Sequence, residues 1–186
     1  EKLFKDIWIQ PAAGDAGGAL GAALAAWHIW LGNERIYNGS YDNMKGAYLG
    51  PAFGTREIKF NALKYDANYS EYTDFNELAG FTARKITEGF VVGWFQGRME
   101  YGPRALGNRS ILGDARNPEM QKKMNLKIKY REGFRPFAPS VLEEDCAKYF
   151  QISIPSPYML FVIPVDESIR KPLPPDYYTK DLYERL

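Results

Sequence analysis

Cysteine and histidine are nearly absent from this chain, which contains one of each. With a single cysteine, Cys146, the chain can form neither an internal disulfide nor a metal site built on cysteines, so we expect a reducing compartment. A single histidine, His28, excludes a metal cage made of several histidines of this chain. A Ser-His-Asp triad is possible by number, but no nucleophile elbow supports it.

Long hydrophobic runs are also lacking. No apolar stretch reaches the roughly 18 residues that a membrane-spanning helix needs, and the N-terminus shows no basic segment followed by an apolar one, as a signal peptide would. Apolar residues make up 45% of the chain and charged residues 25%, as in soluble globular proteins. We therefore expect a cytoplasmic protein without a membrane partner. Because the sequence begins with Glu1 instead of methionine, we also expect a piece of a longer protein.

The whole chain has almost no net charge, but its parts are strongly charged. Lys and Arg number 24 and Asp and Glu 23, which gives a formal net charge of +1. The segment from Arg84 to Arg135 carries a net charge of +7, and the remainder carries −6. A polyanion such as a nucleotide or an acyl phosphate fits the basic segment, and on charge alone a nucleic acid also fits.

Hydrophobic runs and turn residues predict a mixed α/β fold. Strands are expected over Leu3–Ile9, Phe90–Phe95, Ser110–Asp114, Phe137–Leu142 and Tyr158–Val165. Helices are expected from Asp15 to Gly32, near Glu57–Tyr65, from Asp74 to Gly89, from Asn117 to about Lys127, and over Glu143–Phe150. Asp15 and Asp74 are predicted N-caps, because a carboxylate there accepts from the free amides of a first turn.

A loop rich in glycine and arginine follows the strand expected over Phe90–Phe95. Glycine lets the backbone approach a ligand and presents amides to oxyanions, and a guanidinium matches phosphate or carboxylate. The arginines alternate with apolar residues, so we expect partly buried cations that need an anionic partner. The candidate ligand-binding residues of this loop are Arg98, Arg104 and Arg109 with Gly97, Gly102 and Gly107.

Two further segments are candidates for binding. In the first, four cations and one carboxylate share the nine residues from Lys127 to Arg135, and Ser140 follows shortly after. In the second, Gly14 and Asp15 lie between an expected strand and an expected helix, which is a usable phosphate or metal site. A plain N-cap role for Asp15 explains the second segment equally simply.

Three motifs of this chain resemble the O-carbamoyltransferases of nodulation and antibiotic biosynthesis. They are Gly-Asp-Ala-Gly-Gly-Ala-Leu-Gly from Gly14, the stretch from Trp94 to Ile111, and the stretch from Lys129 to Ser140. Members of that family are similar to a fusion of two modules. An RNase H-like (ASKHA-type) module holds a metal and transfers the carbamoyl group, and a YrdC-like module makes carbamoyl-adenylate from carbamoyl phosphate and ATP.

The resemblance implies domains and residue roles. Residues 1–50 would be the tail of the ASKHA-type module, 51–70 a linker, and 71–186 a YrdC-like domain that is incomplete at its C-terminus. Lys129 and Arg131 would be catalytic, because Lys-x-Arg resembles a YrdC signature. Arg98, Arg104, Arg109, Arg135, Ser140 and the three loop glycines would bind substrate or nucleotide. Asp15 would be a metal ligand.

The resemblance also implies partners. ATP would be a substrate accompanied by Mg²⁺, and a divalent metal such as Fe²⁺ would belong to the ASKHA-type module. The other partners would be carbamoyl phosphate and a small-molecule acceptor with a hydroxyl group, with a homodimer as one arrangement of the protein and no nucleic acid. The alternative is a non-catalytic YrdC-like module that binds a nucleotide or RNA.

Overall fold

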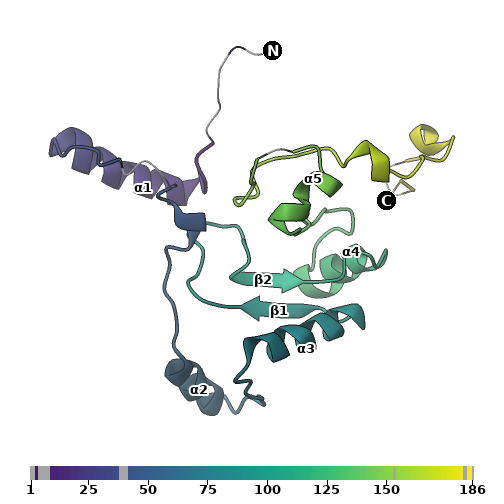
Figure 1. The fold of residues 1–186 in the computed structure, drawn as a ribbon, viewed down its shortest axis with the longest axis horizontal. Coiled ribbons are helices and arrows are strands. Elements are labelled where there is room, and N and C mark those ends of the chain that lie inside the picture. Colours follow the sequence, from purple (N-terminus) through teal and green to yellow (C-terminus); the bar gives the residue numbers. More distant parts are fainter. Residues whose placement is uncertain (1–2, 4–8, 38–41, 153, 182–183, 186) are drawn as a thin grey trace. The chain divides into compact units, whose positions relative to one another are not determined.

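The computed structural model describes residues 3, 9–37, 42–152, 154–181 and 184–185 (Figure 1). The chain forms two compact units. Unit 1 contains Glu1–Glu71, Gly93–Ser110 and Pro157–Leu160, and unit 2 contains Tyr72–Val92, Ile111–Ser156 and Phe161–Leu186. The predicted domain boundaries at residues 50 and 70 stay a prediction.

The first helix of unit 1 confirms the helix expected from Asp15. Helix α1 spans Asp15–Ala25 and continues as a π-helical segment, Ala26–Trp30 (Figure 1). Gly32 follows with a φ of +66°, which ends the helix in the left-handed region that glycine adopts easily. The predicted N-cap is wrong by one residue. Gly14 occupies that position and Asp15 is the first helical residue, because the carbonyl of Ala12 already accepts hydrogen bonds from the amides of Gly14 and Gly17 at 2.8 Å each.

The second helix of unit 1 and two of the expected strands are also present in the structure. Helix α2 spans Thr55–Lys64, and the Glu57 carboxylate accepts a hydrogen bond from the Gly54 amide at 2.9 Å to cap it. Strands β1 (Val92–Phe95) and β2 (Arg109–Leu112) pair as a two-stranded sheet and run in opposite directions in Figure 1. Together, these helices and this small sheet confirm the mixed α/β class.

Unit 2 contains three further α-helices. Helix α3 (Phe75–Thr87) begins as predicted, because the Asp74 carboxylate accepts a hydrogen bond from the Asn76 amide at 2.8 Å. Helix α4 (Met120–Lys123) continues as a π-helical segment, Met124–Lys129. Helix α5 (Cys146–Tyr149) follows a single 3₁₀ turn, Glu143–Asp145.

The start predicted at Asn117 is three residues early. The Asn117 side chain closes a separate turn by accepting a hydrogen bond from the Glu119 amide at 2.9 Å, so helix α4 begins only at Met120.

Two predicted strands are wrong. Residues 137–142 have no strand partner among the described residues, and within 158–165 only Val165 forms a bridge, to Phe150. Pro136, Pro139 and Pro164 explain the difference, because proline lacks the N–H that a ladder hydrogen bond needs. The strand predicted over Leu3–Ile9 lies largely outside the described residues.

Few apolar side chains are fully buried. Met44 and Ala47 are buried in unit 1. Met120 and Met124 are buried in unit 2, where a Cβ atom on Gly113 would lie 2.8 Å from both methionine side chains. Within the described part of the chain, no helix has the length and apolar character to cross a membrane.

Candidate functional site

A buried carboxylate organises the loop between β1 and β2, here called the arginine loop (residues 96–109). The side chain of Glu100 is fully buried. Its Oε1 accepts hydrogen bonds from the amides of Leu106 and Asn108 at 2.8 Å each and from the amide of Arg109 at 3.3 Å. Its Oε2 accepts a hydrogen bond from Arg109 Nε at 3.1 Å. One carboxylate therefore ties both ends of the loop together.

The same contacts set the charge state of Glu100. Burial raises the pKa of this carboxyl, but the amides of Leu106, Asn108 and Arg109, together with its own amide, outweigh burial and hold the pKa below its ordinary value. Glu100 is therefore ionised at neutral pH. Sequence reasoning missed this residue, although a lone carboxylate inside an arginine-rich loop was an available signal.

The three arginines of the loop differ in what they bind. Arg109, with a third of its side chain exposed, pairs with Glu100 and also donates from Nη2 to the Gly102 carbonyl at 2.5 Å. Arg98 is exposed and donates to the Gly50 carbonyl at 2.8 Å. Arg104 is exposed and makes no hydrogen bond or ion pair with any residue that the structure describes. Of the three, Arg104 has all its donors available for a ligand.

The three glycines of the arginine loop all have positive φ values, a backbone conformation that favours glycine. Gly97, Gly102 and Gly107 have φ values of 57°, 101° and 115°. Gly102 also lies against the segment before α1, because a Cβ atom there would be 2.5 Å from the Cβ of Ala12. The structure thus explains these glycines by backbone geometry and close packing, and their role toward a ligand stays a prediction.

Gly102→Ala should therefore destabilise unit 1. The alanine would combine an unfavourable positive φ with an overlap against Ala12, and we expect a loss of about 2 kcal/mol or more in the free energy of unfolding. Urea unfolding of the full chain measures this. Gly18→Ala is the matched control, because it lies in helix α1 with nothing within 4 Å of the added Cβ. Equal stability of the two variants would contradict the packing argument.

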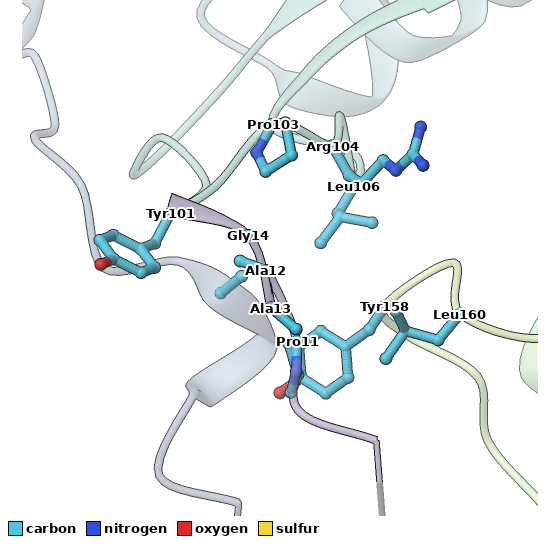
Figure 2. Close-up of a pocket in the computed structure, with 11 residues that line it drawn as sticks. Pro11, Ala12, Ala13, Gly14, Tyr101, Pro103, Arg104, Leu106, Tyr158 and Leu160 are labelled. Carbon is cyan, nitrogen blue, oxygen red and sulfur yellow. The ribbon is translucent and has the colours of Figure 1, made fainter. Parts of the chain in front are cut away.

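A small pocket of about 200 Å³ lies in unit 1 beside the arginine loop (Figure 2). Residues 11–14, Leu106 and Leu160 form much of its wall, and Arg104 is its charged lining residue. In Figure 2 the Arg104 guanidinium points away from Pro11 and Ala13.

The two tyrosine hydroxyls of the pocket lining are already engaged. The Tyr101 hydroxyl donates to the Ala16 carbonyl, and the Tyr158 hydroxyl donates to Asp42. Burial, followed by the bond to Asp42, raises the pKa of Tyr158 to about 12. The Tyr158 hydroxyl therefore stays protonated at neutral pH, and the Tyr101 hydroxyl is occupied by its hydrogen bond.

Asp15 lies in the first turn of α1 and is exposed. Among the described residues, no three His, Cys, Asp or Glu side chains come close enough to hold a metal ion. His28 hydrogen bonds through Nδ1 to the Asn33 carbonyl at 2.8 Å, which is a structural contact. The described residues therefore do not form a metal site by themselves, and Asp15 could supply only one ligand.

A second loop, here called the cationic loop (residues 129–135), follows the π-helical segment of unit 2. The chain turns sharply at Tyr130, whose φ is 48°. Lys129 is exposed and has no hydrogen-bond or ion-pair partner in the described chain, whereas Arg135 Nε donates to the Glu132 carboxylate at 2.8 Å. The backbone hydrogen bond of Glu132, followed by the Arg135 charge, holds the pKa of Glu132 below its ordinary value.

Arg131 is the half-buried cation of the cationic loop. Its guanidinium carbon lies 4.8 Å from the centre of the Phe137 ring, and its Nε donates to the side chain of Asn125 at 2.6 Å. Ser140 lies exposed beyond the loop. The structure thus brings Lys129, Arg131 and Arg135 together in unit 2, and it places the other predicted arginines, with Asp15, in unit 1. The binding and catalytic roles of all these residues stay predictions.

Comparison with known proteins gives a consistent result. The family model described as the carbamoyltransferase C-terminus matches residues 83–181, and the one described as the carbamoyltransferase N-terminus matches residues 1–24. An uncharacterised protein of Synechocystis, sll1178, is 58% identical over 178 residues, covering 95% of this chain and 29% of that protein.

Two relatives with descriptive names are more distant. Nodulation protein NolNO of Sinorhizobium fredii is 43% identical over 171 residues, covering 90% of this chain and 24% of that protein. The 3'-hydroxymethylcephem-O-carbamoyltransferase of Streptomyces clavuligerus is 33% identical over 158 residues, covering 85% of this chain and 27% of that protein. The chain therefore spans less than a third of the length of these three relatives.

Proposed function

This chain belongs to the carbamoyltransferase family, and on that premise we propose that it is part of an O-carbamoyltransferase. Carbamoyl phosphate, ATP and water would give carbamoyl-adenylate, phosphate and pyrophosphate, and the carbamoyl group would then pass to a hydroxyl of a small-molecule acceptor with AMP as the leaving group. Residues 71–186 would belong to a YrdC-like module that makes the adenylate, and residues 1–50 to an ASKHA-type module that transfers it. The single cysteine and the use of ATP fit a cytoplasmic location.

The cationic loop is the observation that carries this proposal. Carbamoyl phosphate and ATP are both polyanions, so bringing them together requires cations that offset their repulsion. Lys129 has no partner in the described chain, and Arg131 keeps both terminal nitrogens without a protein partner there. These two cations would bind phosphate oxygens and stabilise the negative charge that develops as the carbamoyl unit is joined to the α-phosphate. Arg135 and Ser140 would bind further phosphate oxygens.

The arginine loop would contribute anion binding in unit 1. Arg104 would bind a phosphate group of the nucleotide or of carbamoyl phosphate with its free guanidinium, while Arg98 and Arg109 have fewer donors left. Mg²⁺ would accompany ATP. Asp15 would supply one ligand to a divalent metal such as Fe²⁺, with the other ligands coming from outside the described residues.

Variants of the cationic loop test the proposal. Lys129→Ala and Arg131→Ala should each lower carbamoyl-phosphate-dependent ATP turnover by about 100-fold, which is the typical effect of removing a group that stabilises developing charge. Turnover is measured on the protein at its natural length. Lys171→Ala is the control, because Lys171 is an exposed cation of unit 2 outside the candidate binding segments, and its turnover should stay within about twofold of wild type.

Two outcomes would overturn the proposal. Full turnover in both variants, with the fold intact by circular dichroism, would contradict the catalytic role of Lys129 and Arg131. Steeply salt-dependent binding of duplex RNA, without any binding of ATP, would favour the non-catalytic RNA-binding alternative.

A further inference from the structure

Asn125 is a polar side chain in a fully buried position. None of its surface is exposed, and it lies in the π-helical segment Met124–Lys129 of unit 2 next to the buried Met124. A buried carboxamide is unfavourable unless its donors and acceptor are satisfied. Its hydrogen bonds therefore show what the buried position is used for.

All the hydrogen bonds of the Asn125 carboxamide go to the cationic loop. Its Nδ2 donates to the carbonyls of Gly133 at 3.1 Å and Arg135 at 2.8 Å, and its Oδ1 accepts from Arg131 Nε at 2.6 Å. In addition, the Arg131 amide donates to the Asn125 carbonyl at 3.0 Å. Asn125 thus holds the far end of the loop by the backbone carbonyls of Gly133 and Arg135. It holds Arg131 by both the backbone amide and the side chain of that arginine.

The Arg131 guanidinium is fixed without using its terminal nitrogens. Nε bonds to Asn125, and the guanidinium lies over the Phe137 ring at 4.8 Å. Its Nη1 and Nη2 make no hydrogen bond or ion pair within the described residues. These two nitrogens form the part of a guanidinium that binds phosphate in a bidentate manner. Because the side chain is already immobilised, little conformational entropy is lost when an anion binds.

The neutrality of Asn125 distinguishes Arg131 from the other arginine of the loop. Arg135 forms an ion pair with the Glu132 carboxylate, whereas the same carboxylate interacts with Arg131 only through charge, without a hydrogen bond. The carboxamide of Asn125 holds Arg131 as firmly in geometry but adds no negative charge. A carboxylate at residue 125 would keep the contact and compete with a phosphate for the same cation.

We propose that Asn125 is a positioning residue, which holds Arg131 through a neutral acceptor so that its terminal nitrogens stay available to bind a phosphate group. The inference rests on the proposed function, because the phosphate belongs to ATP or to carbamoyl phosphate. It adds to that function a residue that contacts no substrate and acts through Arg131.

A double-mutant cycle on the protein at its natural length tests this role. ATP affinity is measured by calorimetry, and KM and kcat by ATP turnover, for wild type, Asn125→Ala, Arg131→Ala and the double variant. We expect Asn125→Ala to weaken ATP binding about tenfold, in the range expected for losing a hydrogen bond to a charged group. The double variant should bind no more weakly than Arg131→Ala alone, because without the guanidinium Asn125 has nothing to position.

Met124→Ala is the structural control. It removes buried packing from the neighbouring position and touches no loop residue through a side-chain hydrogen bond, so its effect on ATP binding should be small and should add to that of Arg131→Ala. Additive losses for Asn125→Ala and Arg131→Ala, as in this control, would show that Asn125 only supports the fold and would overturn the inference.

Two further measurements apply even where Asn125→Ala fails to fold. Asn125→Asp keeps the acceptor for Arg131, but it adds a charge and replaces the donor to the Gly133 and Arg135 carbonyls with an oxygen, so it should weaken ATP binding at least as much as Asn125→Ala. In Arg131→Ala, a low concentration of guanidinium ion should restore part of the ATP binding, because Asn125 Oδ1 and the Phe137 ring still form its seat. Unimpaired ATP binding by Asn125→Asp, or no rescue by guanidinium, would contradict the inference.

The failure of this inference and that of the proposed function give different results. If wild-type protein neither binds ATP nor turns it over, the proposed function fails and the role of Asn125 fails with it. If wild-type protein binds and turns over ATP while the cycle is additive, only the role of Asn125 is overturned.

Discussion

Glu100→Ala should destabilise unit 1 by about 3 kcal/mol or more, since removing one partner of a buried ion pair leaves the other uncompensated. The variant would deprive Arg109 Nε and the amides of Leu106, Asn108 and Arg109 of their acceptor at once. Because the side chain of Glu100 is fully buried, water cannot easily replace it in an intact loop. The arginine loop would therefore lose its conformation before the rest of unit 1 unfolds.

Urea unfolding of the full chain, followed by tryptophan fluorescence, measures this loss. Trp94 of strand β1 belongs to unit 1 and is only partly exposed, so its emission reports on that unit. Glu34→Ala is the matched control, because Glu34 is an exposed carboxylate of unit 1, and its stability should stay within about 0.5 kcal/mol of wild type. An unfolding midpoint for Glu100→Ala equal to that of the control would contradict the role of Glu100.

The ion pair between Glu100 and Arg109 should also make the stability of the folded chain depend on pH in the acid range. The pKa of Glu100 is lower in the folded chain than its ordinary value of 4.5, so ionised Glu100 stabilises the folded state above about pH 4.5. That contribution is lost as the pH falls through the lower pKa of the folded state. The difference in stability between wild type and Glu100→Gln should therefore be largest near pH 7 and shrink below pH 4.5. A stability difference between wild type and Glu100→Gln that does not change with pH would contradict this prediction.

Arg109→Ala should mainly lower stability and Arg104→Ala should mainly weaken anion binding, although the two arginines lie in the same loop. Arg109→Ala leaves the buried Glu100 carboxylate without its cation and removes the bond to the Gly102 carbonyl, so we expect a loss of about 3 kcal/mol in stability. Arg104→Ala breaks no contact with a described residue, so its stability should stay within about 0.5 kcal/mol of wild type. Arg104→Ala should instead weaken anion binding, which would raise the KM for ATP or carbamoyl phosphate about tenfold.

Paired measurements separate the two roles. Unfolding of the full chain gives the stabilities, and ATP turnover by the protein at its natural length gives KM and kcat. Arg104→Lys keeps the charge and is the conservative control, and it should retain part of the affinity. A normal KM in Arg104→Ala would exclude Arg104 from substrate binding, and unchanged stability in Arg109→Ala would show that its bond to Glu100 contributes little.

The predicted helices succeeded where their ends depend on neighbouring residues. The Asp74 cap and the terminal Gly32 act within a few residues of the helix they bound, so the sequence carries enough information to place them. The start of α4 was misplaced, because Asn117 closes its own turn. The strands predicted at 137–142 and 158–165 failed for a different reason, since a strand needs a partner and prolines interrupt both segments.

The residues of the candidate site could likewise be predicted only in part from the sequence. The sequence indicated the cations of both loops, because arginine and lysine are recognised by residue type and spacing alone. It did not indicate Glu100 or Asn125, which decide how those cations are held. A glutamate and an asparagine at these positions look like ordinary polar residues until their burial is known.

By itself, the sequence determined the family, the mixed α/β class, the charge asymmetry and most helices, because these depend on composition, on motifs and on contacts between near neighbours. Only the tertiary structure decided which arginines are free and which are engaged. Arg109 is held by a buried carboxylate, Arg131 by a neutral amide, and Arg104 by no described residue. The physical reason is burial: a hydrogen bond has little effect in water, but it fixes a side chain when chain folding excludes water from the acceptor, as it does for Glu100 and Asn125.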